Sequence, residues 1–206
     1  MQIRSEALPY VLPPAVVAAA AVAVGAPLVT LVAILIAVAM GSFFRDPQRS
    51  SDAAPNAVLA PADGRILDVR SNDRELEITI FLAIWNVHVT RSPVPGQLLK
   101  CERFSGSHDA AYKPSASNNA RCALSIDSPF GPITVTMISG AVARRIHTWV
   151  GPGDRLERAQ RIGLIRFGSR TEIVLPAGSE PRVSIGERVR AGESVIASAP
   201  PRVGDS

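Results

Sequence analysis

A length of 206 residues predicts one domain, or one domain with an appendage. The formal net charge of +4 is compatible with nucleic-acid binding, but the chain has neither a helix-turn-helix signature nor an RNA-binding aromatic pattern, so we exclude that class. The two cysteines, Cys101 and Cys122, match no metal-ligand or CxxC spacing, which predicts free thiols and no metal site.

The first predicted element is an apolar segment without a charged residue, residues 7–44. A membrane-spanning helix needs only about 20 such residues, and Pro27 stands near the middle of the segment. Two arrangements fit: one kinked, tilted helix from about Ala15 to Met40, or two short helices that form a hairpin in one leaflet. A cleaved signal peptide is disfavoured, because the apolar region of a signal peptide is only about 7–15 residues long and this segment is far longer. We therefore expect residues 1–44 to attach the chain to the cell membrane.

The charges that flank this segment predict on which side of the membrane the rest of the chain lies. Arg45 and Arg49 follow the segment closely, whereas Arg4 before it has Glu6 nearby. The positive-inside rule then places the C-terminal part on the cytoplasmic side. Nearly all basic residues lie after the segment, and anionic lipid headgroups are the simplest partner for a basic domain tethered to a bilayer.

Residues 45–206 are predicted to form a β-rich domain. β-branched and aromatic residues without helical periodicity fill residues 76–94, 132–140 and 171–176, and Pro or Gly recurs every ten or so residues. Only residues 108–123 lack a strand signal. There we expect a loop with a short helix.

A near-repeat occurs within this domain. GDRLERAQRIGLI (153–165) resembles GERVRAGESVIA (186–197), because both have a glycine, an acid, an arginine and an aliphatic residue before a turn and a further short strand. The phrase PADGRILDV (61–69) has a related pattern. Such units are typical of small barrels and of the biotinyl/lipoyl-like sandwich. We therefore predict a mainly β fold, a biotinyl/lipoyl-like β-sandwich or barrel hybrid, behind an N-terminal hydrophobic helical membrane segment.

Few side chains in the domain can carry acid–base chemistry. His88, in NVHVTRSPVPG, is predicted to stand at the end of a strand before a Pro-rich turn, where functional residues are often positioned. His108 in the loop and His147 in a basic strand are interpreted as structural or solvated. Asp63 in PADG has an ordinary interpretation as well, since Asp-Gly after Pro favours a turn.

The stretch RIGLIRFGSRTEIVLP (161–176) reads as two strands with small residues where they meet, Gly168 and Ser169. An isolated glycine in a strand usually marks a bulge or a tight bend. A second interpretation is that the bond between the two residues is meant to break.

Five motifs, in this order and spacing, closely resemble the short bacterial form of phosphatidylserine decarboxylase. They are FFRDPQR, APADGRI, NVHVTRSPVPG, ARRIHTWVGPGDRLERAQRIGLIRFGSR and TEIVLP. The resemblance covers essentially the whole chain after the membrane segment, and the FGS block that follows GDRLERAQRIG is its most specific part.

The resemblance implies a proenzyme, or zymogen, that cuts itself between Gly168 and Ser169. The cut leaves a β chain of residues 1–168 and an α chain of residues 169–206, which stay partners. Ser169 becomes an N-terminal pyruvoyl group, the covalent cofactor that forms a Schiff base with the substrate amine. A phospholipid in the membrane is the implied substrate, and the question of a homo-oligomer is left open.

The implied reaction is a lyase step of phospholipid biosynthesis, the decarboxylation of phosphatidylserine to phosphatidylethanolamine. The resemblance suggests His88 as the base that acts on Ser169, with Asp63 orienting the imidazole in a triad-like arrangement. Backbone strain alone, about 1–3 kcal/mol, supplies at most roughly a hundredfold in rate, so a base must contribute. His88 is also a candidate proton donor to the carbanion left by carbon dioxide.

Two positions depart from the family pattern. The family's usual Asn-Glu-Arg triplet reads Asn119-Ala120-Arg121 here, and Arg91 stands where the long form has a second histidine. The resemblance therefore assigns no headgroup-binding residues.

A membrane-anchored adaptor with a lipoyl-like domain and no catalysis is the alternative function. Such adaptors carry a long heptad-patterned hairpin between two β halves, and the sequence has none. A lipoyl or biotin carrier needs a lysine at a hairpin tip, and neither Lys100 nor Lys113 has that setting. The scarcity of lysine also argues against a pyridoxal enzyme.

Overall fold

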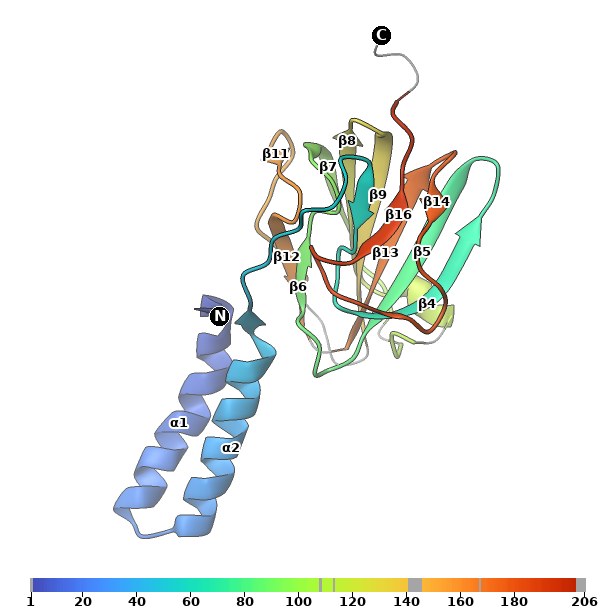
Figure 1. Cartoon of the computed structure of the whole chain (residues 1–206). Coiled ribbons are helices and arrows are strands. Elements are labelled where there is room, and N and C mark those ends of the chain that lie inside the picture. Colours follow the sequence, from blue (N-terminus) through green and yellow to red (C-terminus); the bar gives the residue numbers. More distant parts are fainter. Residues whose placement is uncertain (1, 108, 113, 141–145, 167, 203–206) are drawn as a thin grey trace. The chain divides into compact units, whose positions relative to one another are not determined.

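The computed structural model describes residues 2–107, 109–112, 114–140, 146–166 and 168–202. Contacts within the chain divide it into two compact units, Met1–Gln48 and Arg49–Ser206. Figure 1 shows a pair of helices in the first unit and β-strands throughout the second.

The N-terminal unit is a helical hairpin. A 3-10 turn, η1 (Ser5–Ala7), leads into α1 (Leu8–Ala23), and α2 (Pro27–Phe43) returns alongside it. A two-stranded antiparallel ladder, β1 (Gln2–Ile3) with β2 (Arg45–Asp46), closes the open end. Of the two arrangements expected from the sequence, the pair of helices is confirmed and the single kinked helix is wrong.

The surface of the two helices is apolar, and the charged residues of the hairpin lie at the end where the β1–β2 ladder forms. Leu28, Leu35 and Val38 on α2 are more than half exposed, and helices that are apolar on all sides are suited to lipid. One helical stretch, Ser5–Ala23, is long and apolar enough to cross a membrane by length and composition. Arg4 forms an ion pair with Asp46 at 3.7 Å beside the ladder. The hairpin thus weakly supports membrane association.

The second unit is mainly β, as predicted. Its largest sheet has eight antiparallel strands and curls into a half-barrel. In order across the sheet these strands are β11 (Arg155–Leu156), β7 (Gly96–Phe104), β8 (Arg121–Ser128), β9 (Gly131–Ser139), β13 (Ser169–Pro176), β5 (Glu75–Leu82), β4 (Gly64–Ser71) and β15 (Arg188–Val189).

Two small antiparallel sheets complete the unit. One contains β10 (Ile146–Thr148), β12 (Arg161–Ile165) and β6 (Val89–Arg91), and the other contains β14 (Glu180–Pro181), β16 (Val195–Ser198) and β3 (Ala57–Leu59). A 3-10 helix, η2 (Pro114–Asn118), lies in the segment expected to be a loop with a short helix. The short helix is therefore confirmed, whereas residues 121–123 of that segment belong to strand β8.

The strands of the large sheet alternate between side chains buried in the core and side chains that are more exposed. In β8, Cys122, Leu124 and Ile126 are buried and the residues between them are half-buried, the period of two expected of a strand with one face on a core. The inward residues of β5 and β13 continue the same apolar cluster. Burial of each such side chain contributes about 1.5–3 kcal/mol before entropy is subtracted.

The continuous strand signal over residues 76–94 is broken in the structure. β5 ends at Leu82, and a turn follows in which the Asn86 N–H donates to the Ala83 carbonyl at 2.8 Å. The Asn86 side chain accepts from the Ala83 N–H at 2.9 Å, a local bond that lets asparagine compete with the ladder. His88 therefore stands just before β6, and the expectation that it ends a strand is wrong.

The near-repeat is confirmed by matching backbone hydrogen bonds. We call residues 60–66 with 186–194 the first copy, and residues 92–98 with 153–160 the second copy. In the first copy the Ile66 N–H donates to the Glu187 carbonyl, and in the second copy the Leu98 N–H donates to the Asp154 carbonyl, both at 2.9 Å. A second matching pair runs from the Gly192 N–H to the Ala60 carbonyl and from the Ala159 N–H to the Ser92 carbonyl, again both at 2.9 Å. As a result β15 pairs with β4 as β11 pairs with β7, and these pairs form the two edges of the large sheet.

Candidate functional site

The Gly168–Ser169 bond lies where the chain passes from one sheet to another. β12 ends at Ile165 in a small sheet, and β13 begins at Ser169 in the large one. Gly168 has a φ of +62°, a left-handed conformation that costs other L-residues about 1–2 kcal/mol. The predicted bend is therefore confirmed, and glycine is what makes it accessible.

Ser169 is fully buried at the first position of β13. It pairs with Ser139 of β9 on one side and with Leu82 of β5 on the other. Its Oγ has no hydrogen-bond partner among the described residues. Leaving a buried hydroxyl unpaired costs about 1–3 kcal/mol, so this serine invites a functional explanation.

Gly140 packs directly against the carbonyl of Gly168. A Cβ placed on Gly140 would lie 2.0 Å from the Gly168 oxygen and 3.0 Å from its carbonyl carbon. Only glycine leaves room for this carbonyl, which is the one that cleavage would break from Ser169. The sequence interpretation missed this residue, because a glycine at the end of PITVTMISG indicates only the end of a strand.

Asn119 ties down the end of β9 beside Ser169. Its side chain is fully buried, and Nδ2 donates to the carbonyls of Ser139 and Asp109, both at 2.7 Å. Its Oδ1 accepts from the Asp109 N–H at 2.8 Å and from the Ser107 hydroxyl at 3.0 Å. The family triplet drew attention to Asn119, but its positioning role emerges only from these contacts.

His88 is fully buried and its backbone is paired with the strand that leads to Ser169. The Ile165 N–H donates to the His88 carbonyl at 3.2 Å. Nδ1 of His88 lies 2.9 Å from the Asn86 carbonyl oxygen, which can only accept. Nδ1 therefore carries the proton, and in the neutral ring Nε2 then holds the lone pair of a base.

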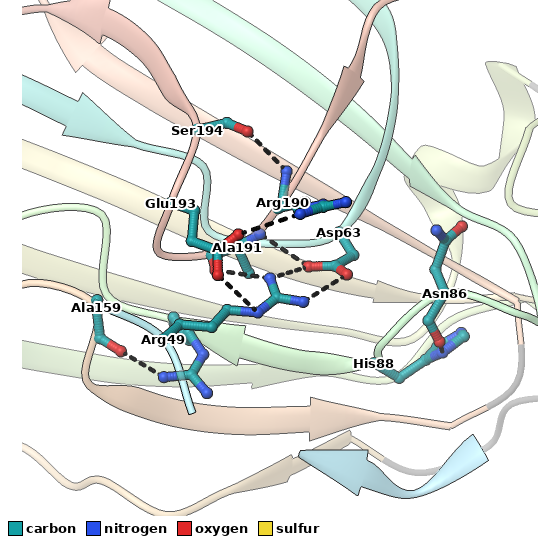
Figure 2. Close-up of polar contacts among 10 residues, drawn as sticks. Arg49, Asp63, Asn86, His88, Ala159, Arg190, Ala191, Glu193 and Ser194 are labelled. Atoms are coloured by element: carbon teal, nitrogen blue, oxygen red, sulfur yellow. Dashed lines mark hydrogen bonds and ion pairs between the residues drawn. The ribbon is translucent and has the colours of Figure 1, made fainter. Parts of the chain in front are cut away.

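Asp63 forms a buried ion pair with Arg49. The two side chains meet through both carboxylate oxygens, with Arg49 Nη2 2.8 Å from Oδ2, and the Ala191 N–H donates to Oδ1 at 2.8 Å. In Figure 2 the dashed lines from Asp63 lead to Arg49 and Ala191, and that from His88 leads to Asn86. A contact between Asp63 and His88 stays a prediction.

A comparison with protein families identifies the chain. The family model described as phosphatidylserine decarboxylase matches residues 36–197. The chain belongs to the phosphatidylserine decarboxylase family. Proteins named phosphatidylserine decarboxylase proenzyme from Burkholderia ambifaria and Burkholderia lata are each 46% identical over 171 residues, and that from Burkholderia vietnamiensis is 45% identical. Each alignment covers 79% of this chain and 80% of the relative.

The region matched by the decarboxylase family contains every predicted site residue. Gly168, Ser169, His88 and Asp63 all lie within it, as does Gly140. The name proenzyme denotes a precursor, which agrees with the resemblance that the motifs suggested.

Arg49 has a different environment from the one expected of a residue that flanks a membrane segment. Its side chain is only 6% exposed, and besides Asp63 it donates to the Ala191 carbonyl at 2.7 Å. A buried guanidinium needs such partners because desolvation penalises an unpaired charge. Arg49 is therefore not a surface charge, and Arg45 is the closest basic residue left for the positive-inside argument.

The remaining residues considered in the sequence analysis have other surroundings or lie outside the described residues. His147 is exposed in β10, its ring 6.1 Å from that of Trp149, and His108 lies outside the described residues. Cys101 and Cys122 are free, as predicted, with their Sγ atoms 3.5 Å apart. Among the residues that the structure describes, no group of three or more His, Cys, Asp or Glu side chains could hold a metal ion.

Proposed function

We propose that the chain is a self-cleaving phosphatidylserine decarboxylase that converts phosphatidylserine to phosphatidylethanolamine. One observation carries the proposal: a chain of this family has a buried serine hydroxyl without a described partner, placed directly after a left-handed glycine. The names of the relatives supply the substrate and the precursor state.

Self-cleavage begins at Ser169. Its hydroxyl attacks the Gly168 carbonyl carbon while His88 accepts the hydroxyl proton at Nε2. His88 returns this proton to the peptide nitrogen, which leaves as an amine and gives an ester. Removal of the proton on the Ser169 Cα then expels the Gly168 carboxylate and leaves a dehydroalanine. Tautomerisation and addition of water release ammonia and leave a ketone, so residue 169 becomes an N-terminal pyruvoyl group.

The residues around the bond fit this chemistry. Gly140 packs closely against the Gly168 carbonyl and restricts its position, and Asn119 holds the end of β9 beside it. The Asn86 carbonyl keeps the proton of His88 on Nδ1, so that Nε2 can act as base. The pyruvoyl group supplies an electron sink for decarboxylation. His88 then holds the proton that the substrate carbon takes up after carbon dioxide leaves.

We propose Asp63 as a positioning residue for His88. The Asp63 carboxylate accepts a hydrogen bond from the Ala191 N–H. The loop that contains Asp63 is also bonded to β6, because the Arg91 N–H donates to the Pro61 carbonyl at 2.8 Å. β6 begins one residue after His88. These contacts support an indirect effect, in which Asp63 fixes the position of β6 and thereby the position of the His88 imidazole.

The two chains produced by cleavage are expected to stay together. β13, the first strand of the chain 169–206, is hydrogen-bonded to β9 and β5 of the chain 1–168 on its two sides. β15 and β16 add pairings to β4 and β3. We also propose that the matching edges make this unit a biotinyl/lipoyl-like sandwich hybrid.

Membrane attachment through the helical hairpin fits a substrate that stays in the bilayer. Both ends of the hairpin meet at the β1–β2 ladder, so they lie on one side of the apolar layer. We propose the cell membrane as the location, with the domain Arg49–Ser206 on its cytoplasmic side.

Intact mass analysis of the purified full chain tests the proposal. The unaltered chain is expected to give two fragments, 1–168 and 169–206, the smaller with a ketone in place of its first amine, and to release carbon dioxide from phosphatidylserine. Ser169→Ala is expected to stay whole and inactive. Ser128→Ala, which removes another buried serine hydroxyl, is the matched control and should be cut normally. An unaltered chain that stays whole yet decarboxylates the lipid would refute the mechanism, and one that does neither would favour a non-catalytic adaptor.

A further inference from the structure

A basic pocket of about 340 Å³ opens beside the reactive bond. It is lined by residues of β7, β8, β9 and β10, by Ala120, which precedes β8, and by Arg166, which follows β12. We call it the arginine pocket after its three arginines, Arg103, Arg121 and Arg166. We propose that it binds the phosphodiester of the lipid headgroup, an inference that rests on the proposed function.

The charge of the pocket favours an anion. Its three guanidinium groups come from separate segments of the chain, and none of the nine described residues that line it carries a carboxylate. Like charges gathered in one concavity repel each other, and a bound anion relieves that repulsion. Guanidinium groups also match the geometry of phosphate oxygens, to which they donate two parallel hydrogen bonds.

Neutral groups hold two of the arginines in place. Arg103 Nη2 donates to the Thr148 hydroxyl at 2.7 Å, and the guanidinium carbon of Arg121 lies 4.6 Å from the centre of the Phe104 ring. These contacts orient the two side chains. A ligand therefore finds donors that have already lost part of their conformational freedom.

The position of the pocket identifies the headgroup as its occupant. Ser139 lines the pocket and is the strand partner of Ser169, and Arg166 precedes Gly168 by two residues. In a serine phospholipid only a few bonds separate the phosphodiester from the amine. A phosphodiester held by the arginines therefore leaves the amine within reach of residue 169.

The apolar wall of the pocket agrees with a lipid rather than with free phosphate. Phe104 is 41% exposed and Ile146 is half-buried, and both face the same space as the arginines. The glyceryl part of the lipid can cover this surface, whereas inorganic phosphate gains nothing from it. The lipid headgroup should therefore bind more tightly than the free ion.

Binding is first measured in a Ser169→Ala chain, where the result depends neither on cleavage nor on turnover. Calorimetric titration uses sn-glycero-3-phosphoserine and, separately, inorganic phosphate. Arg121→Gln and Arg103→Gln are each expected to weaken glycerophosphoserine binding at least tenfold. Arg74→Gln, which removes an exposed arginine from the turn between β4 and β5, is the control and should change nothing.

Turnover is then measured with the cleaved enzyme on phosphatidylserine in mixed micelles. Arg121→Gln and Arg103→Gln should raise KM about tenfold and leave kcat within twofold, and Arg121→Lys should recover part of the loss. Thermal melting checks that each variant is folded.

Three results would overturn the inference. One is that Arg121→Gln and Arg103→Gln have an affinity for glycerophosphoserine and a KM within twofold of the Arg74→Gln values. Another is a fall in kcat with an unchanged KM, and the third is inorganic phosphate binding as tightly as glycerophosphoserine. Failure of the proposed function would look different, because the unaltered chain would then show no cleavage and no carbon dioxide while the titrations still report on the pocket.

Discussion

The two copies of the near-repeat share one backbone frame but differ in what is attached to it. In each copy a Pro-containing loop is hydrogen-bonded to a Gly-acid-Arg turn, with matching donors and acceptors. The first copy carries Asp63, whose counterpart in the second copy is Pro95. The second copy is preceded by His88 and followed by Gly168–Ser169. The backbone frame is therefore a scaffold, and the chemistry that we propose depends on side chains that only one copy has.

The position of His88 shows the difference most directly. The His88 carbonyl accepts from the Ile165 N–H, and in the first copy the Asn56 carbonyl accepts from the Ala199 N–H at 3.0 Å. The two residues thus occupy corresponding places, one buried with an imidazole and the other exposed with an amide.

The largest expected effect comes from removing the imidazole. His88→Gln should slow self-cleavage by about 10²–10⁴-fold, the range of a general base, because Ser169 then has no proton acceptor. The rate is followed as the appearance of two chains on a denaturing gel. Asn56→Ala, at the corresponding place in the first copy, is the control and should be cut at the normal rate. Equal rates for the two variants would contradict the role of His88.

Gly140→Ala should also block cleavage, by at least tenfold. The added Cβ would lie 2.0 Å from the Gly168 oxygen, so the scissile carbonyl must move, and small misplacements of reacting groups are costly. Gly151→Ala is the control, because a Cβ there meets no atom within 4 Å. Time courses of cleavage at equal stability, checked by urea unfolding, separate this effect from misfolding.

Asp63→Asn tests the feature found only in the first copy. Loss of the carboxylate removes the nearer counter-charge of the buried Arg49 guanidinium and leaves Glu193 at 3.8 Å, which should lower the free energy of unfolding by about 3–5 kcal/mol. Arg49→Gln should cost a similar amount. Urea unfolding measures both. If Asp63 also positions His88, Asp63→Asn should slow cleavage more than Arg49→Gln does, and identical cleavage rates would leave Asp63 with a structural role alone.

A pair of exchanges at corresponding turn positions sharpens the comparison of the frames. Gly192 has a φ of +72° in the first copy, and Ala159 has +62° in the second. Gly192→Ala should lower stability by about 1–2 kcal/mol or more, since the new Cβ would also lie 3.0 Å from the Ala159 Cβ. Ala159→Gly should raise stability by about 0.5–1 kcal/mol, because glycine adopts this conformation without strain. Thermal unfolding gives both values, and equal signs would contradict the shared geometry.

The smallest effect concerns the cysteines, which only the second copy's side of the sheet contains. Burial, together with the neighbouring Cys101 thiol, raises the pKa of the Cys122 thiol from 9.0 to about 12. The folded state thus prefers the neutral thiol, so this contribution to stability is complete below pH 9 and falls as the pH rises toward 12. At pH 8, iodoacetamide should leave Cys122 unmodified in the folded chain, as read by peptide mass. Rapid labelling of Cys122 would contradict its burial.

The sequence predicted those features whose signals are local. The β-rich composition, the repeated glycine-acid turn and the bend at Gly168 each depend on neighbouring residues, and all are found. The apolar segment did not distinguish one helix from two, because Gly25 and Pro27 fit a kink as well as the turn that they form, in which Gly25 has a φ of +68°.

The features that were missed depend on residues far apart in the chain. Gly140 matters because of a carbonyl 28 positions later, and nothing in PITVTMISG indicates that contact. Arg49 reads as a charge flanking a membrane segment, yet it is buried against Asp63. The Asn86 turn also interrupts a run whose composition favours strand throughout.

The place that we propose for the cut, at the start of β13, has one further consequence. Chain ends usually fray, but an end created at residue 169 would be hydrogen-bonded into the middle of a sheet and shielded from water. An electrophile formed there is held as rigidly as a core side chain. It needs no binding site of its own, has no dissociation constant, and cannot be lost by dilution.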